Sequence, residues 1–144
     1  MKLEIVTNSP DETIAVAEKI GRLLCGGEVI AYKGDLGAGK TTFTKGIVKG
    51  MGLNVDVLSP TFAIVNEYQS EGKPTLYHFD MYRITNEDDL YATGFFDYLD
   101  ENNVLCIEWS ENITDSLPED TITVDIQNLG ETKRKITVFG GMFE

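Results

Sequence analysis

One segment of the sequence has the residue types and spacing that hold a polyphosphate. Gly34-Asp35-Leu36-Gly37-Ala38-Gly39-Lys40-Thr41 matches G-x-x-x-x-G-K-[ST] at every fixed position. Glycines let successive backbone N–H groups point inward around a phosphate, and a following helix adds its positive end. Lys40 can reach the β- and γ-phosphates, and the Thr41 hydroxyl can contact Mg²⁺. The pattern predicts binding of ATP or GTP; the alternative is a glycine-rich turn with a solvated Lys40.

The expected contacts to the nucleotide extend slightly beyond the fixed positions of this phosphate loop, residues 34–41. Thr42 adds a second hydroxyl, which can help to hold the α-phosphate. We therefore expect the phosphates of ATP or ADP, with Mg²⁺, to be held by Asp35, Leu36, Gly37, Ala38, Gly39, Lys40, Thr41 and Thr42.

Cleavage of the nucleotide needs more than a phosphate loop. It requires an acid that organises the metal and a group that positions a water molecule. Asp80 and Glu108 each follow a short apolar run that is predicted to be a strand, and ligands of open α/β sheets gather at strand ends. We expect Lys40, Asp80 and Glu108 to be catalytic, and Thr41, Asp80 and Glu108 to hold the metal. The alternative is that each acid only bonds local backbone.

Three further residues are candidates on weaker grounds. Thr61, in the loop Ser59–Phe62, can respond to a γ-phosphate as switch loops do, although Pro60 alone could set a turn there. Trp109 can stack on a ligand or simply pack. His78, the only histidine, fits a core or edge position better than a catalytic base.

Composition and charge limit the class of protein. The chain has 144 residues, which suits a single domain over 1–144. Its net charge of −12 disfavours direct binding of RNA, which needs a basic surface. The sequence has no apolar run long enough for a membrane span and no apolar segment typical of a signal peptide, so we expect a cytoplasmic protein without membrane contact. Cys25 and Cys106 lack metal-ligand spacing, and Cys106 is expected to be buried.

The periodicity of apolar residues predicts an α/β fold. Ser9 and Pro10 predict a helix start, and Gly26-Gly27 its end, while a second helix is expected from about Gly39 to Met51. An edge strand is expected around residues 3–5, a third helix at 86–92, and further strands at 28–33, 63–68, 75–80, 104–109, 121–126 and 135–139. The sum is a P-loop NTPase-like mixed sheet, parallel in its centre and antiparallel in the second half, flanked by helices.

Four motifs together resemble one known family. They are G-D-L-G-A-G-K-T-T at 34–42, S-P-T-F at 59–62, H-F-D-M-Y-R at 78–83 and I-E-W-S-E at 107–111. In this order they are similar to the bacterial TsaE (YjeE) family, and the resemblance covers nearly the whole chain. It implies an ATPase subunit, slow in isolation, that acts in threonylcarbamoyladenosine modification of tRNA. The implied partner is a TsaD/TsaB-type complex, so that tRNA is reached only indirectly.

The resemblance also carries roles to individual residues. It implies that Lys40 and Thr41 serve the phosphates and Mg²⁺, that Glu108 is a metal-linked acid, and that Asp80 and Trp109 are functionally important. Family members typically form the base pocket from the start of the first helix and the last strands. Thr7 and Arg134 are the candidates here, although no motif marks them.

Other functions remain compatible with the phosphate loop. A small-molecule kinase would use the same loop, but no arginine-rich lid segment is present. A non-hydrolysing module whose nucleotide state gates a partner is also possible. A GTPase is disfavoured because the sequence has no N-K-x-D motif, and Arg83 is a weak candidate for an arginine finger.

Overall fold

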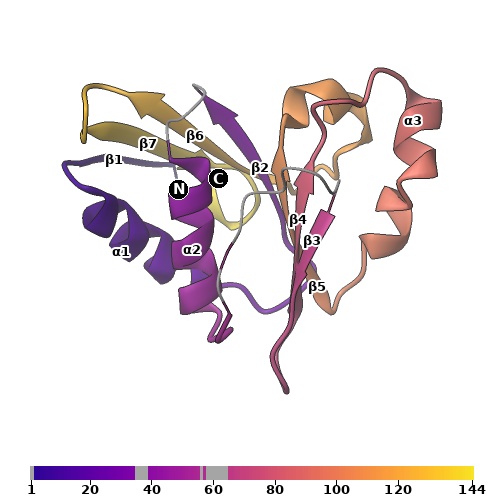
Figure 1. Ribbon diagram of the computed structural model, residues 1–144, viewed down its shortest axis with the longest axis horizontal. Helices are drawn as coiled ribbons and strands as arrows, with labels where there is room; N and C mark the ends of the chain where they lie inside the picture. The colour runs from indigo at the N-terminus through magenta and orange to yellow at the C-terminus, as the bar shows by residue number, and fades with distance from the viewer. Residues whose placement is uncertain (1, 35–38, 56, 58–64) are drawn as a thin grey trace.

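The computed structural model describes residues 2–34, 39–55, 57 and 65–144. These residues form one seven-stranded sheet in the order β1-β7-β6-β2-β5-β4-β3, with helices on both faces (Figure 1). The strands are β1 Leu3–Thr7, β2 Val29–Gly34, β3 Val65–Tyr68, β4 Thr75–Asp80, β5 Asn103–Glu108, β6 Ile122–Asn128 and β7 Arg134–Phe139.

The central strands are parallel, which confirms the predicted fold class. β2 pairs in parallel with β5 and β6, and β4 pairs in parallel with β5. The predicted hairpins are antiparallel, β3 with β4 and β6 with β7, and the N-terminal strand β1 also pairs antiparallel with β7. Because parallel strands run the same way, the carboxyl ends of β2, β4, β5 and β6 meet at one edge of the sheet.

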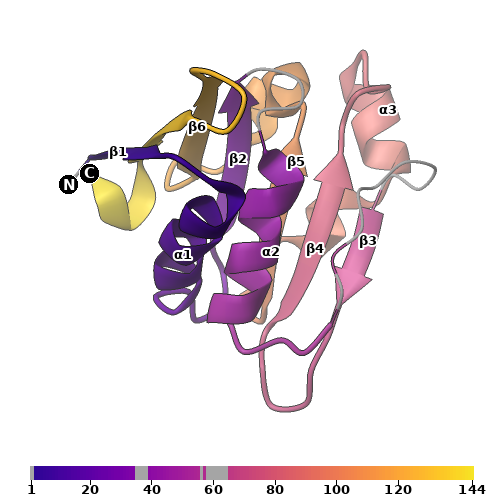
Figure 2. The ribbon, with the colours of Figure 1, turned by 60° about the vertical axis from the view of Figure 1, so that its left-hand side comes forward.

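Two layers of helix cover the sheet. The α-helices among the described residues are α1 Pro10–Gly21, α2 Lys40–Gly50 and α3 Glu87–Ala92. α1 and α2 lie side by side on one face, and α3 packs on the other (Figure 2). On β5, Val104 and Cys106 pack towards α1 and α2, whereas Leu105 and Ile107 pack with Leu90 of α3. Both faces of the central strands are thus buried, which explains their continuous apolar sequences.

Helix α1 begins where the sequence predicts and ends earlier. Ser9 is its N-cap, and the Ser9 hydroxyl accepts a hydrogen bond from the Glu12 backbone N–H at 3.1 Å. The prediction that Gly26-Gly27 ends this helix is wrong, because α1 ends at Gly21. Gly26 instead allows a close approach between two loops, since a Cβ there would lie 2.2 Å from the Glu101 carbonyl oxygen.

The remaining elements agree with the sequence to within a few residues. Trp109, predicted as the end of a strand, lies just beyond β5, and positions 63 and 64 lie outside the described residues. Three short 3₁₀ helices in the described part of the chain were not predicted, because such turns have no long hydrophobic period. They are η1 Phe95–Tyr98, η2 Ser110–Ser116 and η3 Gly141–Phe143. Every helix in the described ranges falls short of the length and apolarity that a bilayer span requires.

Glycines bring α1 and α2 into close contact. A Cβ at Gly46 of α2 would lie 2.5 Å from the Cβ of Ala17, and one at Gly50 would lie 2.1 Å from the Glu18 carbonyl oxygen. Neither position accepts a larger side chain without a shift of α1. This contact fixes α2, and therefore the first turn of α2, relative to the sheet.

Candidate functional site

Two carboxylates lie side by side where the central strands end. Asp80 is the last residue of β4, Glu108 is the last residue of β5, and the two are register partners. Because side chains alternate along a strand, both lie on the sheet face covered by α2, the face to which Leu76 and Val104 also belong. The two predicted acids are therefore brought together at one edge of the sheet.

The two described ends of the phosphate loop have backbone conformations that favour glycine. Gly34 has φ 118° and Gly39 has φ 106°. A Cβ at Gly34 would also lie 2.0 Å from the Ile126 carbonyl oxygen of β6. The chain therefore leaves β2 and enters α2 through positions that other residues rarely adopt. The contacts predicted for Asp35, Leu36, Gly37, Ala38 and Thr61 lie outside the described residues.

The first turn of α2 differs from the first turns of α1 and α3. Ser9 and Asn86 cap those two helices through their side chains, and both helices carry acids in the first turn. α2 starts after Gly39 with no side-chain cap and no acid in its first turn, and Lys40, Thr41 and Thr42 occupy that turn. The positive end of α2 is thus left for an external anion, in a chain whose net charge is −12.

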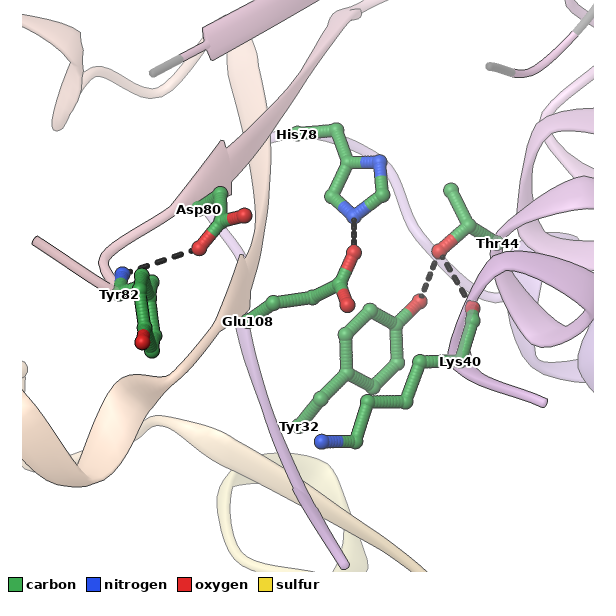
Figure 3. A network of polar contacts seen from close by, with 7 residues as sticks. All are labelled: Tyr32, Lys40, Thr44, His78, Asp80, Tyr82 and Glu108. Atoms are coloured by element: carbon green, nitrogen blue, oxygen red, sulfur yellow. Dashed lines mark hydrogen bonds and ion pairs between the residues drawn. The ribbon is translucent and has the colours of Figure 1, made fainter. Parts of the chain in front are cut away.

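A buried hydroxyl pair anchors this first turn to the sheet. The Tyr32 hydroxyl of β2 lies 2.7 Å from the Thr44 hydroxyl, which donates to the Lys40 carbonyl oxygen at 2.9 Å (Figure 3). Tyr32 and Thr44 are both fully buried. The backbone of Lys40 is therefore held in place, while its side chain makes no ion pair with any described residue.

Glu108 contacts a buried histidine rather than local backbone. His78 Nε2 lies 2.6 Å from Glu108 Oε2 (Figure 3). The distance is short enough for an ion pair, which requires a protonated imidazole, and neither atom has an aligned hydrogen bond to any described residue. His78 is fully buried, as expected for a core histidine, whereas the Glu108 side chain is 17% exposed. The Glu108 side chain is thus partly accessible, whereas His78 is not.

Two weak acids lie behind this pair on the same face. Burial, opposed by a hydrogen bond with Tyr32 and assisted by the charge of Glu108, raises the pKa of the Cys106 thiol to about 12. Burial also raises the pKa of Tyr32 well above its usual range. Both groups stay protonated at neutral pH, so the negative charge in this region belongs to Glu108 and Asp80.

Asp80 and Trp109 both contact Tyr82, which follows the end of β4. Asp80 Oδ1 accepts a hydrogen bond from the Tyr82 backbone N–H at 2.9 Å, which is the local contact that the sequence left as an alternative. Trp109 has φ 59°, the one positive φ of a non-glycine residue in the described ranges. Its ring packs against Tyr82 with centroids 4.9 Å apart. A large side chain held in this conformation is strained, and such strain clusters at functional sites.

The donors present suit a magnesium ion that is carried by a nucleotide. No group of three His, Cys, Asp or Glu side chains in the described parts of the chain could hold a metal alone. Mg²⁺ needs hard oxygen ligands, and it is commonly bound through one or two carboxylates together with substrate phosphates. Asp80, Glu108 and the Thr41 hydroxyl provide that kind of donor beside the start of α2, so the residues fit the ion.

A small cavity of about 50 Å³ lies beside the start of α2. It is lined by Pro10, Thr13, Gly39, Thr42, Glu131, Thr132 and Arg134. Arg134, a candidate for the base pocket, thus lines a cavity together with Gly39 and Thr42, and its Nη1 donates to the Gly130 carbonyl oxygen at 2.8 Å. Thr7 is buried behind the wall, with its hydroxyl 2.7 Å from that of Thr13.

Sequence reasoning missed the contact between His78 and Glu108. The signal was available: His78 precedes Asp80 by two residues on β4, and its register partner Cys106 precedes Glu108 by two on β5. Residues two apart share a sheet face, so parallel pairing of these strands places His78 diagonally opposite Glu108. Thr13, Thr44 and Tyr32 are further polar residues of the site that no motif indicates.

The fold and this edge of the sheet together define a P-loop NTPase-like α/β protein. A family model described as "Threonylcarbamoyl adenosine biosynthesis protein TsaE" matches residues 7–136. The chain therefore belongs to the TsaE family.

Individual relatives agree with this assignment. The tRNA threonylcarbamoyladenosine biosynthesis protein TsaE of Bacillus subtilis is 40% identical over 131 residues, which cover 91% of this chain and 81% of that protein. The protein of the same name from Treponema pallidum is 37% identical over 94% of this chain and 99% of its own length. The crystal structure of Bacillus subtilis YdiB superposes with a TM-score of 0.75 at 34% identity, covering 97% of this chain and 86% of that one.

Proposed function

We propose that this chain is a magnesium-dependent ATPase that supports threonylcarbamoyladenosine modification of tRNA through a TsaD/TsaB-type protein complex. The observation that carries the proposal is the first turn of α2, which is uncapped and free of acids, beside the paired carboxylates Asp80 and Glu108. An anion site next to metal-organising acids is what hydrolysis of a nucleoside triphosphate requires.

Each residue has a role in this proposal. Backbone N–H groups at the start of α2 bind the phosphates, and Lys40 neutralises charge that develops between the β- and γ-phosphates. Glu108 and Thr41 hold the metal, and Asp80 orients the attacking water. The nucleoside lies towards the cavity that Arg134 lines, on the other side of α2 from Glu108. Bound Mg²⁺ would supply charge neutralisation at the phosphate oxygens.

The isolated protein is expected to turn over slowly. Arg83 is exposed, and Arg134, which lines the cavity at the start of α2, donates to the Gly130 carbonyl oxygen; neither is assigned to the transition-state charge in this proposal. Stabilising charge from a partner in trans accelerates such reactions by about 10³–10⁵-fold in other P-loop enzymes. A complex that binds at the carboxyl edge of the sheet would therefore raise the rate.

The test is steady-state ATP hydrolysis with the partner complex present. Lys40→Ala and Glu108→Ala should each lower kcat by at least about 100-fold, since each removes an electrostatic contact to the transition state. Lys45→Ala is the matched control, because Lys45 is an exposed lysine one turn further along α2. Wild-type rates in both site variants would refute the assignment of the site.

The fate of the γ-phosphate distinguishes the rival functions. With γ-labelled ATP, this proposal expects all label as free phosphate, whereas a small-molecule kinase would place it on an acceptor. A non-hydrolysing module would release no label under any condition and would still bind its partner differently with ATP and with ADP.

A further inference from the structure

His78 contacts one of the two oxygens of the Glu108 carboxylate. Of the two carboxylate oxygens, Oε2 is buried and contacts His78 Nε2 at 2.6 Å. Oε1 points away from His78 in Figure 3, towards the part of the view where Tyr32 and the Lys40 side chain are drawn. One oxygen is therefore buried against His78, and the other is directed away from it.

The imidazole itself has no second polar partner that would explain its burial. Nδ1 is buried and has no hydrogen-bond partner among the described residues. Its ring packs edge-on against Tyr32, with centroids 6.4 Å apart. Nε2 likewise has no aligned hydrogen bond to a described residue, and it lies 2.6 Å from Glu108 Oε2. Burying an imidazole in this way is costly if the ring only packs, so we take the contact with Glu108 as the function of the position.

We propose that His78 is a positioning residue: Nε2 carries the proton and holds Glu108 Oε2, which turns Oε1 towards the metal and phosphates. The inference rests on the proposed function, in which Glu108 serves Mg²⁺. A carboxylate on a glutamate side chain has three rotatable bonds, and fixing one oxygen removes most of that freedom. Outer partners that orient metal ligands typically change metal affinity or activity by about 10–100-fold when removed.

The test compares two substitutions that differ in the donor. His78→Phe keeps an aromatic ring against Tyr32 and removes the N–H, whereas His78→Gln keeps an N–H at similar reach. Leu76→Ala is the control for lost packing, because Leu76 is fully buried on the same strand and face, two residues away. Each protein is assayed for ATP hydrolysis with the partner complex and for binding of Mn²⁺ in the presence of ADP, measured by electron paramagnetic resonance.

The expected pattern separates positioning from packing. His78→Phe should lower kcat and weaken Mn²⁺ binding, each by at least about tenfold, with KM for ATP and ADP affinity in EDTA within about twofold of wild type. His78→Gln should recover both to within about threefold. Leu76→Ala should lower the melting temperature and leave kcat and Mn²⁺ affinity unchanged. Equal loss in the Phe and Gln variants, or no loss in the Phe variant, would overturn the proposal.

A spectroscopic measurement is independent of catalysis. Because His78 is the only histidine in the sequence, a long-range ¹H–¹⁵N spectrum contains one imidazole and needs no assignment. The proposal predicts a proton on Nε2 and a large shift of that nitrogen in Glu108→Gln, but not in Asp80→Asn. If wild type binds no nucleotide while this pattern is seen, the ATPase proposal fails and the contact stands. An Nε2 without a proton, or a spectrum insensitive to Glu108→Gln, refutes the positioning role itself.

Discussion

The buried thiol of Cys106, on the same strand as Glu108, should make the free energy of unfolding depend on pH. The folded protein holds the Cys106 thiol proton until about pH 12, whereas the unfolded chain loses it near pH 9.0. Between these values the unfolded state binds fewer protons, so the free energy of unfolding falls as pH rises, by about 1.4 kcal/mol per pH unit. The stabilisation is complete below pH 9 and is lost progressively above it.

Urea unfolding between pH 8 and pH 10.5 measures this effect. Cys106→Ala should lose about 1.4 kcal/mol per pH unit less than wild type over the upper part of that range. Tyr32, whose pKa is also raised and partly by Cys106, contributes mainly above its usual pKa of 10.0, so the comparison is made between pH 9 and pH 10. Parallel pH profiles for the two proteins would show that the Cys106 thiol is not buried as described.

Helix α2 carries the proposed phosphate site at its start, and it packs against α1 through glycine residues. Alanine normally stabilises a helix interior by about 1 kcal/mol relative to glycine. At Gly46 the sign should reverse, because a Cβ there would lie 2.5 Å from both the Ala17 Cβ and the Ile14 carbonyl oxygen. We expect Gly46→Ala to destabilise the protein by about 1–3 kcal/mol in urea unfolding.

The control for this prediction is Gly130→Ala, where the nearest atom would be 3.8 Å away and φ is not positive. It should change the free energy of unfolding by less than about 0.5 kcal/mol. If Gly46→Ala is as stable as Gly130→Ala, α1 and α2 do not pack as closely as described. Loss of nucleotide affinity in Gly46→Ala, beyond any unfolding, would show that this contact also positions the first turn of α2.

The elements were largely predictable because apolar periodicity and turn residues are local properties. The strand runs, the Ser9 cap and the hairpin turns each depend on neighbours in sequence. The end of α1 was not predictable in this way. Gly26 looks like a helix stop in the sequence, but the structure uses this glycine for a close approach to Glu101, which is far away in the chain. The order of strands is likewise a tertiary property, although the parallel centre followed from the buried apolar runs.

At the scale of the whole molecule, the charge determines what the protein can bind without help. With a net charge of −12, the chain should not bind tRNA directly. Filter binding in about 50 mM salt, where electrostatic contacts are strongest, should retain no tRNA with this protein alone. Retention should appear when the TsaD/TsaB-type complex is added. Micromolar binding by the isolated protein, weakening steeply with salt, would contradict indirect action.

The candidate site was predictable only in part, because some of its residues belong to local motifs and others are brought together by the fold. A phosphate loop and strand-end acids are visible as motifs, and the sheet brings Asp80 beside Glu108. The positioning groups, His78 on β4 and Thr44 on α2, depend on which strands and helices are neighbours. No single motif encodes those neighbours, which is why these residues emerge only from the structure.

The central claim is that the uncapped start of α2 binds the phosphates of ATP. Isothermal titration calorimetry with MgATP tests it most directly, using wild type, Lys40→Ala and the exposed control Lys45→Ala. Wild type and Lys45→Ala should give saturable heat, and Lys40→Ala should bind at least about tenfold more weakly, as expected when a charged hydrogen bond is lost. No heat from wild type with ATP or GTP, or equal affinity in Lys40→Ala, would contradict it.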